Sequence, residues 1–325
     1  IPIIYKAADG GGGESTTWSR PTEWLSQPDY SSTDNEMDLL FFVGENYPND
    51  IALSVTTDSG DYQVDWGDGT VDTVSSGSNA EHKYNYADID VGTQMANGQR
   101  QVMIKVTATN NFTGVDFDVK PSTDPKTEWT SDIIEINMVG SLINSLNLRN
   151  ENETKLINFN FQGTNQLTAI HSMFTDLISL QNIQALDTSS VTSMYYTFSN
   201  CSSLTTIPQL DTSSVTNMDY TFNNCYSLTT IPQLDTSSVT SMGNTFRSCY
   251  SLSEVNFINF GLGEDAFDLE NTNLTREKLV NVFEDLPDRT STTQGTLTIT
   301  GAYGANNLTQ TQLDIAINKN WNVVN

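Results

Sequence analysis

The chain has 325 residues, with 40 Asp and Glu against 14 Lys and Arg, so its formal net charge is −26. So few cations cannot form the basic surface that nucleic-acid binding or attachment to an anionic membrane requires. Ser, Thr and Asn together make up 107 residues, and no run of 18 apolar residues predicts insertion into a membrane.

The first 38 residues are predicted to form an extended docking arm. Gly10–Gly13 is a flexible run, and the short apolar stretch before it is too brief for a signal segment. Two tryptophans then flank a proline, which is typical of a segment that packs on another surface. That surface is either the protein's own β-sheets or a neighbouring subunit. The residues expected to make the contact are Trp18, Arg20, Pro21 and Trp24.

Residues 39–120 are predicted to form a module of short strands. Ile51–Val55 alternates between apolar and polar residues, as a half-buried strand does. Tyr62–Thr70 holds an Asp-Gly turn signal, and Gln101–Thr109 forms a long Val-rich strand. Many short strands separated by turns favour a β-sandwich.

The order Trp66-Gly-Asp-Gly-Thr, His82-x-Tyr84 and a Val-rich strand resembles a PKD (polycystic kidney disease) domain. The family's usual Pro-Gly-x-Tyr is missing, and an insertion from Ala87 to Arg100 stands in its place. The resemblance implies an Ig-like β-sandwich with Trp66 in the core and Asp68 in a turn.

The acidic residues and the histidine of this module have two chemical alternatives to a structural role. No nucleophile of matching spacing accompanies Asp65, Asp68 and His82, so catalysis there is disfavoured. Bound Ca²⁺ near Asp58, Asp61, Asp65 and Asp68 is the other alternative, although the spacing of an EF-hand is absent. We therefore expect no catalytic residue, no metal ligand and no cofactor, with calcium as a weak exception.

A repeat dominates the second half of the chain. Residues 121–166 are predicted to be a connector with irregular early coils, and residues 167–257 hold the repeats. Three gapless 24-residue copies start at Leu186, Leu210 and Leu234, and a divergent copy precedes them. A fixed period of this length predicts a solenoid, in which each unit buries its apolar residues against its neighbours.

Three cysteines share one repeat position, where the divergent copy has a leucine. They are Cys201, Cys225 and Cys249. We expect buried thiols that act as small hydrophobes, because one thiol per coil does not match a zinc site. A disulfide between adjacent coils is an open alternative. Within each unit, Val-Thr-x-Met predicts an extended stretch, and the spacing of three in Thr-Phe-x-x-Cys-x-x-Leu predicts a helical or 3₁₀ turn.

Another repeat position carries an aspartate at the start of an Asp-Thr-Ser-Ser run, namely Asp187, Asp211 and Asp235. These residues are predicted to cap turns, with a calcium-binding ladder as the alternative. The whole unit resembles the BspA-like leucine-rich repeats that also occur in mycoplasma surface lipoproteins, except that Thr197, Thr221 and Thr245 replace a second Met.

Residues 258–325 are predicted to cap the repeats with two helix–strand units. One helical face carries apolar residues at spacings of three and four, and a capping box opens a second helix. The face consists of Leu279, Val282, Phe283 and Leu286; the box is Thr309 with Gln312; and the strands are Thr296–Thr300 and Trp321–Val324. The fold class is therefore mainly β with short helices, a PKD/Ig-like β-sandwich followed by a BspA-type leucine-rich-repeat solenoid.

The order of these motifs, from RPTEW through WGDGT to the repeats and a terminal Trp-x-Val-Val, resembles a type of virion protein found in tailed phages. The resemblance implies a head decoration, fibre or tail protein on the virion surface. Its expected partners are coat, portal or tail proteins, other copies of itself, and a host glycan or receptor. The alternatives are a secreted or cell-surface bacterial adhesin and an accessory domain of a carbohydrate-active enzyme.

Residues that differ between otherwise constant repeat units are the natural place for a binding surface. These residues follow the Met and the Cys that are the same in all three units, and one such position holds Ser199, Asn223 and Arg247. We expect the side chains at these positions to point outward. Tyrosines at such positions offer flat apolar faces with hydroxyl groups, which suit glycans or proteins. The predicted binding residues are Tyr195, Tyr196, Asp219, Tyr220, Tyr226, Arg247 and Tyr250; solvated tyrosines with no ligand are the alternative.

Overall fold

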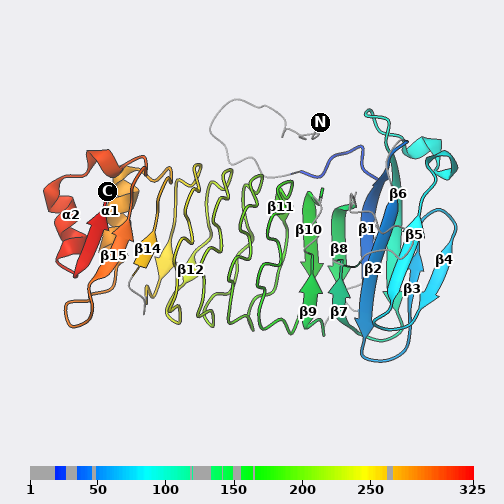
Figure 1. Cartoon of the computed structure of the whole chain (residues 1–325), viewed down its shortest axis with the longest axis horizontal. Coiled ribbons are helices and arrows are strands. Elements are labelled where there is room, and N and C mark those ends of the chain that lie inside the picture. The colour runs from blue at the N-terminus through cyan, green and yellow to red at the C-terminus, as the bar shows by residue number, and fades with distance from the viewer. Residues whose placement is uncertain are drawn as a thin grey trace.

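The structure, a computed structural model, describes residues 19–26, 35–45, 49–117, 119, 133–140, 142–148, 155–163, 165–261 and 266–325. Most of the predicted arm, including Trp18, lies outside these residues. The fold is mainly β, with two α-helices and several sheets. The molecule is elongated, with the two largest sheets at one end, stacked coils in the middle and both helices at the other end (Figure 1).

A seven-stranded sheet has the strand order β11-β10-β8-β1-β6-β3-β4. Strand β1 pairs antiparallel with β6 and β8, whereas β10 pairs in parallel with β8 and β11. Its strands are β1 (Glu36–Val43), β3 (Tyr62–Asp65), β4 (Val71–Val74), β6 (Arg100–Ala108), β8 (Ile133–Val139), β10 (Asn158–Gln162) and β11 (Asn182–Ile183). The sheet thus combines antiparallel pairs with parallel pairs that lead into the repeats.

A four-stranded sheet, with the order β5-β2-β7-β9, shares one hydrophobic core with the first sheet. Its strands are β2 (Asp50–Thr57), β5 (Asn79–Lys83), β7 (Phe112–Asp116) and β9 (Ser145–Asn147). The predicted strands are confirmed as β2, β3 and β6, and Trp66 is fully buried in the core as expected. Two short 3₁₀ helices follow β5: Tyr86–Asp88 leads into the insertion and Val91–Thr93 lies within it.

The predicted connector contributes strands to both sheets. Its strand β8 lies between β1 and β10, and all seven of its residues are buried. Its strand β9 pairs in parallel with β7 in the other sheet. The early coils are therefore continuous with the sheets of the first half, and backbone hydrogen bonds run from β1 through β8 and β10 into the first repeat.

The repeats stack in parallel with a spacing of 24 residues. Single bridges join Ala169 to Ser193, Ser193 to Asn217, and Asn217 to Ser241. The short strands β12 (Leu234–Asp235) and β13 (Phe257–Ile258) pair on another side of the coils. The predicted extended stretch is thus reduced to one bridging residue per coil.

The segment predicted to be a helical or 3₁₀ turn forms separate turns closed by hydrogen bonds to the third residue before, such as Cys201 N–H to the carbonyl of Phe198 at 3.1 Å, and no continuous helix. Tyr196 and Asn200 have φ angles of 57° and 63°, and a right-handed helix cannot continue through such residues. The N–H of Tyr196 donates to Asp219 in the next coil, at 3.0 Å. Apolar residues three apart fit a turn as well as a helix, and the bonds between coils select the turn.

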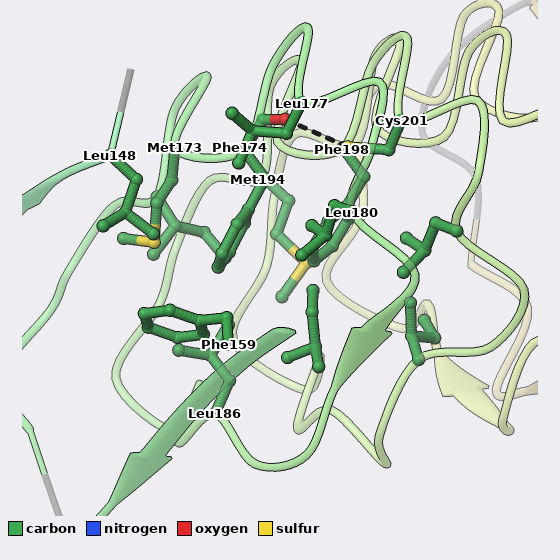
Figure 2. Close-up of a cluster of buried hydrophobic side chains, with 14 of the residues drawn as sticks. Leu148, Phe159, Met173, Phe174, Leu177, Leu180, Leu186, Met194, Phe198 and Cys201 are labelled. Carbon is green, nitrogen blue, oxygen red and sulfur yellow. Dashed lines mark hydrogen bonds between the residues drawn. The ribbon is translucent and has the colours of Figure 1, made fainter. Parts of the chain in front are cut away.

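The interior of the repeats is a ladder of phenylalanines. Phe174, Phe198, Phe222 and Phe246 are fully buried. Their ring centroids are 5.2, 5.3 and 5.7 Å apart, and successive rings are inclined by 12° or less. Figure 2 shows the first part of this ladder, where Phe174 and Phe198 lie beside Met194, Leu180 and Cys201.

The three cysteines are free and buried, as predicted, so the disulfide alternative is not realised. The Sγ–H of Cys201 donates to the carbonyl of Phe174 in the preceding coil, at 2.9 Å (Figure 2). Cys225 and Cys249 repeat this bond at 3.1 Å. Burial raises the pKa of all three thiols, that of Cys249 to about 12, so these groups stay protonated at neutral pH.

The repeats end in a three-stranded parallel sheet covered by two helices. Its strands are β14 (Ala266–Asp268), β15 (Gly295–Thr298) and β16 (Trp321–Val324), with helices α1 (Arg276–Asp285) and α2 (Gln310–Ile317) and a 3₁₀ helix at Ala305–Asn307. The predicted capping box at Thr309 is confirmed, as are both helices and both strands. Neither helix of the described chain is long and apolar enough to cross a membrane.

Candidate functional site

One group of predicted site residues consists of Tyr195, Tyr196 and Tyr220. The rings of Tyr196 and Tyr220 stack across adjacent coils with centroids 4.5 Å apart and planes inclined by 12°. Tyr195 meets Tyr196 edge-on at 4.5 Å and is 40% exposed. Burial raises the pKa of Tyr196, and the neighbouring Tyr195 and Tyr220 raise it further. The phenol group of Tyr196 therefore remains neutral at physiological pH.

The backbone holds Tyr196 and Tyr220 in an unusual conformation. Their φ angles are 57° and 56°, and the same position in the third coil is Asn244, with φ 54°. Asparagine tolerates this left-handed region, whereas a bulky residue there costs about 1–2 kcal/mol. Bonds between coils fix the backbone of both tyrosines, so the two rings are displayed on a rigid support.

A second group consists of Tyr226 and Tyr250. Their ring centroids are 5.3 Å apart, and the side chains are 44% and 56% exposed. Among the ring contacts of the described residues, none joins this pair to the first group. The tyrosines among the predicted binding residues thus form two separate rows, one after the constant Met and one after the constant Cys of the repeat units.

The polar residues of the predicted site are held by their own neighbours. Asp219 accepts a hydrogen bond from the N–H of Gly243, at 2.5 Å. Arg247 forms an exposed ion pair with Glu270, at 3.3 Å. Ser199 is 1% exposed, so its predicted outward orientation is wrong, because the turn at that position packs against the next coil.

His171 is a neighbour of the first group and is not among the binding residues predicted from the sequence. Its ring meets Tyr195 edge-on at 6.4 Å, and its Nδ1 lies 3.2 Å from the hydroxyl of Ser193. His171 stands 24 residues before Tyr195. This spacing of one repeat period is the sequence signal that indicates a position beside Tyr195.

The repeat aspartates cap turns, as predicted. Asp187, Asp211 and Asp235 each accept the N–H of the serine two residues later. Burial raises the pKa of Asp187, but bonds from Ser189 and Asn165 outweigh it, so the pKa lies below its usual value. These aspartates also line a groove of about 470 Å³ that crosses the coils, which the sequence did not indicate.

Several of the carboxylates named for the calcium alternatives accept hydrogen bonds from nearby groups. Within the described parts of the chain, no group of three or more His, Cys, Asp or Glu side chains is arranged to hold a metal ion. Asp58 accepts hydrogen bonds from Asn111, and Asp65 accepts one from the N–H of Gly67. These carboxylates therefore serve the loops in which they lie.

Residues 19–26 of the predicted arm lie on the seven-stranded sheet, and we call them the strap. The predicted end of the arm at residue 38 is wrong, because β1 already begins at Glu36. Arg20 Nε lies 3.1 and 2.9 Å from the two carboxylate oxygens of Glu135, whose side chain is fully buried. Trp24 is 4% exposed, and its backbone N–H donates to the carbonyl of Pro21 at 3.2 Å. Of the two surfaces expected for the arm, the structure places the strap on the protein's own sheet.

Asp68 and His82 form a polar pair in the module of short strands. His82 Nε2 lies 2.7 Å from Asp68 Oδ2, and the imidazole stacks on Trp66 at 4.9 Å. The other oxygen of Asp68 accepts the N–H and hydroxyl of Thr70, at 3.0 and 2.6 Å. Asp68 is thus the turn residue that the sequence predicts, and the pair ties the turn to strand β5.

This pair predicts a pH-dependent contribution to stability. Burial raises the pKa of Asp68, but its bonds with Thr70 and His82 outweigh that effect and hold the pKa below 3.8. The charged form therefore stabilises the fold above 3.8, and this contribution is lost as the pH falls through the lowered pKa. We expect Asp68→Asn to reduce the free energy of unfolding at neutral pH by about 1 kcal/mol or less.

Thermal unfolding of both proteins across the acid range measures this effect. The difference between wild type and Asp68→Asn should disappear well below pH 3.8. Asp61→Asn, a change in an exposed carboxylate of the same module, is the matched control. A difference that is constant with pH would contradict the assignment.

The comparisons with known proteins concern the repeats. A family described as "Mycoplasma protein of unknown function, DUF285", which is related to the BspA-like repeats, matches residues 144–259. No curated protein matches the sequence, and no solved structure matches it either. The family match begins before the repeats predicted from the sequence and includes strands β9, β10 and β11.

Proposed function

We propose that this chain is a non-enzymatic surface protein that binds a glycan or a protein partner through the tyrosines of its repeats. In this proposal a PKD-like β-sandwich precedes a BspA-type leucine-rich-repeat solenoid. The proposed parts are a docking arm at 1–38, the sandwich at 39–120, a connector at 121–166, the repeats at 167–257 and capping units at 258–325.

The observation that carries the proposal is the stacked pair of Tyr196 and Tyr220. Two aromatic rings stand on a rigid backbone whose conformation is unfavourable for tyrosine, so their presence there calls for a reason beyond the local fold. A flat apolar face with hydroxyl groups at its edge matches the surface of a sugar ring or a protein. Rigid aromatic residues also lose little entropy when they bind.

The surface on which we place the protein is that of a tailed-phage virion. The order of the motifs along the chain supports this setting, as does a surface rich in hydroxyl and carboxylate groups. Its partners there would be coat, portal or tail proteins, further copies of the chain, and a glycan or receptor on the host. Such a protein needs neither a cofactor nor a catalytic residue.

A second setting, the surface of a bacterial cell, is favoured by the match of the repeats to a family of mycoplasma proteins. The two settings differ in where the protein is found. Mass spectrometry of purified particles and of cell envelopes from the source separates them. Peptides in intact particles support the virion, and peptides confined to the envelope or medium support the bacterial adhesin.

The binding proposal predicts that each tyrosine row can be removed without loss of the fold. The double variant Tyr196→Asn with Tyr220→Asn introduces asparagine, the residue that the third coil has at this position as Asn244. Asparagine tolerates the positive φ angle there. Tyr226→Ser with Tyr250→Ser uses the residue of the first coil, Ser202. We expect the first pair of changes to weaken binding to a glycan array or to host cells about tenfold or more, as for central aromatic contacts elsewhere.

The matched control is Tyr303→Ser, because Tyr303 is 68% exposed and lies outside the repeats. Unfolding curves of all variants establish that the fold is retained. If the changes at Tyr226 and Tyr250 alone weaken binding, the ligand sits on the second row. If neither pair of changes alters binding, the tyrosines are solvated residues and the proposal fails.

A further inference from the structure

The strap occupies a specific binding site on the seven-stranded sheet. Its Arg20 pairs through Nε and Nη2 with the buried carboxylate of Glu135, the Nη2 distance being 2.8 Å. Gln101 on β6 holds the strap backbone at two points, accepting the N–H of Leu25 at 2.9 Å and donating to the carbonyl of Glu23 at 2.8 Å. The ion pair of Arg20 and the backbone hydrogen bonds to Gln101 therefore make the site specific for the strap.

The apolar half of the site is separate from the main core. Trp24 meets Phe42 edge-on, with ring centroids 6.3 Å apart. Together with four further buried side chains they form a cluster on the opposite face of the sheet from the main core; these are Leu40, Met95, Ile134 and Ile157. Because neighbouring residues of β1, such as Phe41, belong to the main core, the strap can leave without opening that core.

The docked strap is also connected to the first repeat. Asn158 on β10 donates to Glu135 at 2.7 Å, and Asn182 on β11 donates to Asn158, also at 2.7 Å. Arg20, Glu135, Asn158 and Asn182 thus form a row of polar contacts across neighbouring strands. A strap on this site stabilises the junction between the sheets and the repeats.

We propose that the strap is an exchangeable connector that docks on the same site of a second copy of the chain. Residues 27–35 separate it from β1, and a segment of that length can reach on the order of 30 Å when extended. Two copies that exchange straps satisfy both buried carboxylates and both tryptophan sites, with no new contact required. The occupant is therefore a second copy, and its Arg20 supplies the cation.

Local concentration decides between the two arrangements. A short tether gives the strap a millimolar effective concentration at its own site, so the closed form dominates in dilute solution. Chains packed side by side on a surface reach the same range, and there exchange competes with closure. The proposal concerns self-association and does not depend on whether the tyrosines bind a ligand.

Paired charge reversals test the proposal on the full chain. Arg20→Glu places two acids at the site, and Glu135→Arg places two cations there, so neither variant can close its own strap. When the two variants are mixed, both exchanged contacts join opposite charges. We expect each variant alone to be a monomer and the equimolar mixture to give a particle of twice the mass in analytical ultracentrifugation. A mixture that stays monomeric overturns the proposal.

A second measurement decides the matter if either variant fails to fold. Chains carrying Leu25→p-benzoylphenylalanine are prepared with normal and with heavy nitrogen, mixed at high concentration and irradiated. Exchange predicts cross-linked peptides that combine a light strap with a heavy sheet, and the fraction of such peptides rises with concentration. Cross-links that remain within one isotope at every concentration overturn the proposal.

Discussion

Replacing Phe222 by alanine is expected to lower the free energy of unfolding by about 3–5 kcal/mol. Phe222 is fully buried and stacks between Phe198 and Phe246, at 5.3 and 5.7 Å. The coils on both sides are fixed to it by backbone bonds, so they cannot collapse into the space that the ring leaves. Denaturant unfolding followed by circular dichroism measures the change.

Tyr226→Ala is the matched control, because it removes an aromatic ring from the same coil at an exposed position. Surface changes of this kind alter stability by about 0.5 kcal/mol or less. Equal effects of the two substitutions would contradict the view that the phenylalanine ladder, and not the outer face, stabilises the repeats. The comparison holds the coil and the type of side chain constant.

Arg20→Met is expected to destabilise the protein by about 3 kcal/mol, because it removes a cation from the fully buried carboxylate of Glu135. Replacing the Glu135 carboxylate by a neutral group as well should restore the lost stability. The double variant Arg20→Met with Glu135→Gln retains an amide oxygen for the bond from Asn158, and we expect it to recover most of the lost stability.

Arg247→Met is the control for the second prediction. Its ion pair with Glu270 is exposed, the two side chains being 48% and 24% accessible, and such pairs contribute about 0–1 kcal/mol. Chemical denaturation of the single and double variants gives the coupling between Arg20 and Glu135. A double variant no more stable than Arg20→Met would contradict the role assigned to the buried charge.

The parts of the fold that local signals define were predictable from the sequence. The capping box at Thr309 and the apolar face of α1 are set by residues three and four apart, and the structure contains both. The gapless period likewise identified the interior side chains of the repeats. Patterns of this kind need no knowledge of the rest of the chain.

Features that depend on partners distant in sequence were not predictable. The insertion of β8 between β1 and β10 joins segments some 100 residues apart along the chain, and no local pattern specifies that pairing. The turns at Tyr196 fit the same apolar spacing as a helix, and bonds to the next coil decide between them. The outward positions of Tyr195, Tyr226 and Tyr250 were predictable from the repeat register, but the half-buried state of Tyr196 and Tyr220 and the separation into two rows depend on contacts between coils.

Because the seven-stranded sheet continues into the repeats, the number of repeat units sets the length of the molecule. Backbone hydrogen bonds join β1 to β8, β8 to β10 and β10 to β11 directly. Adjacent strands are spaced about 4.8 Å apart, so each added 24-residue unit would move the helical end away from the sheets by one such step. The number of units thus determines the distance between the sheets and the helical end. Duplication of the gene segment that encodes one unit changes this distance in equal steps.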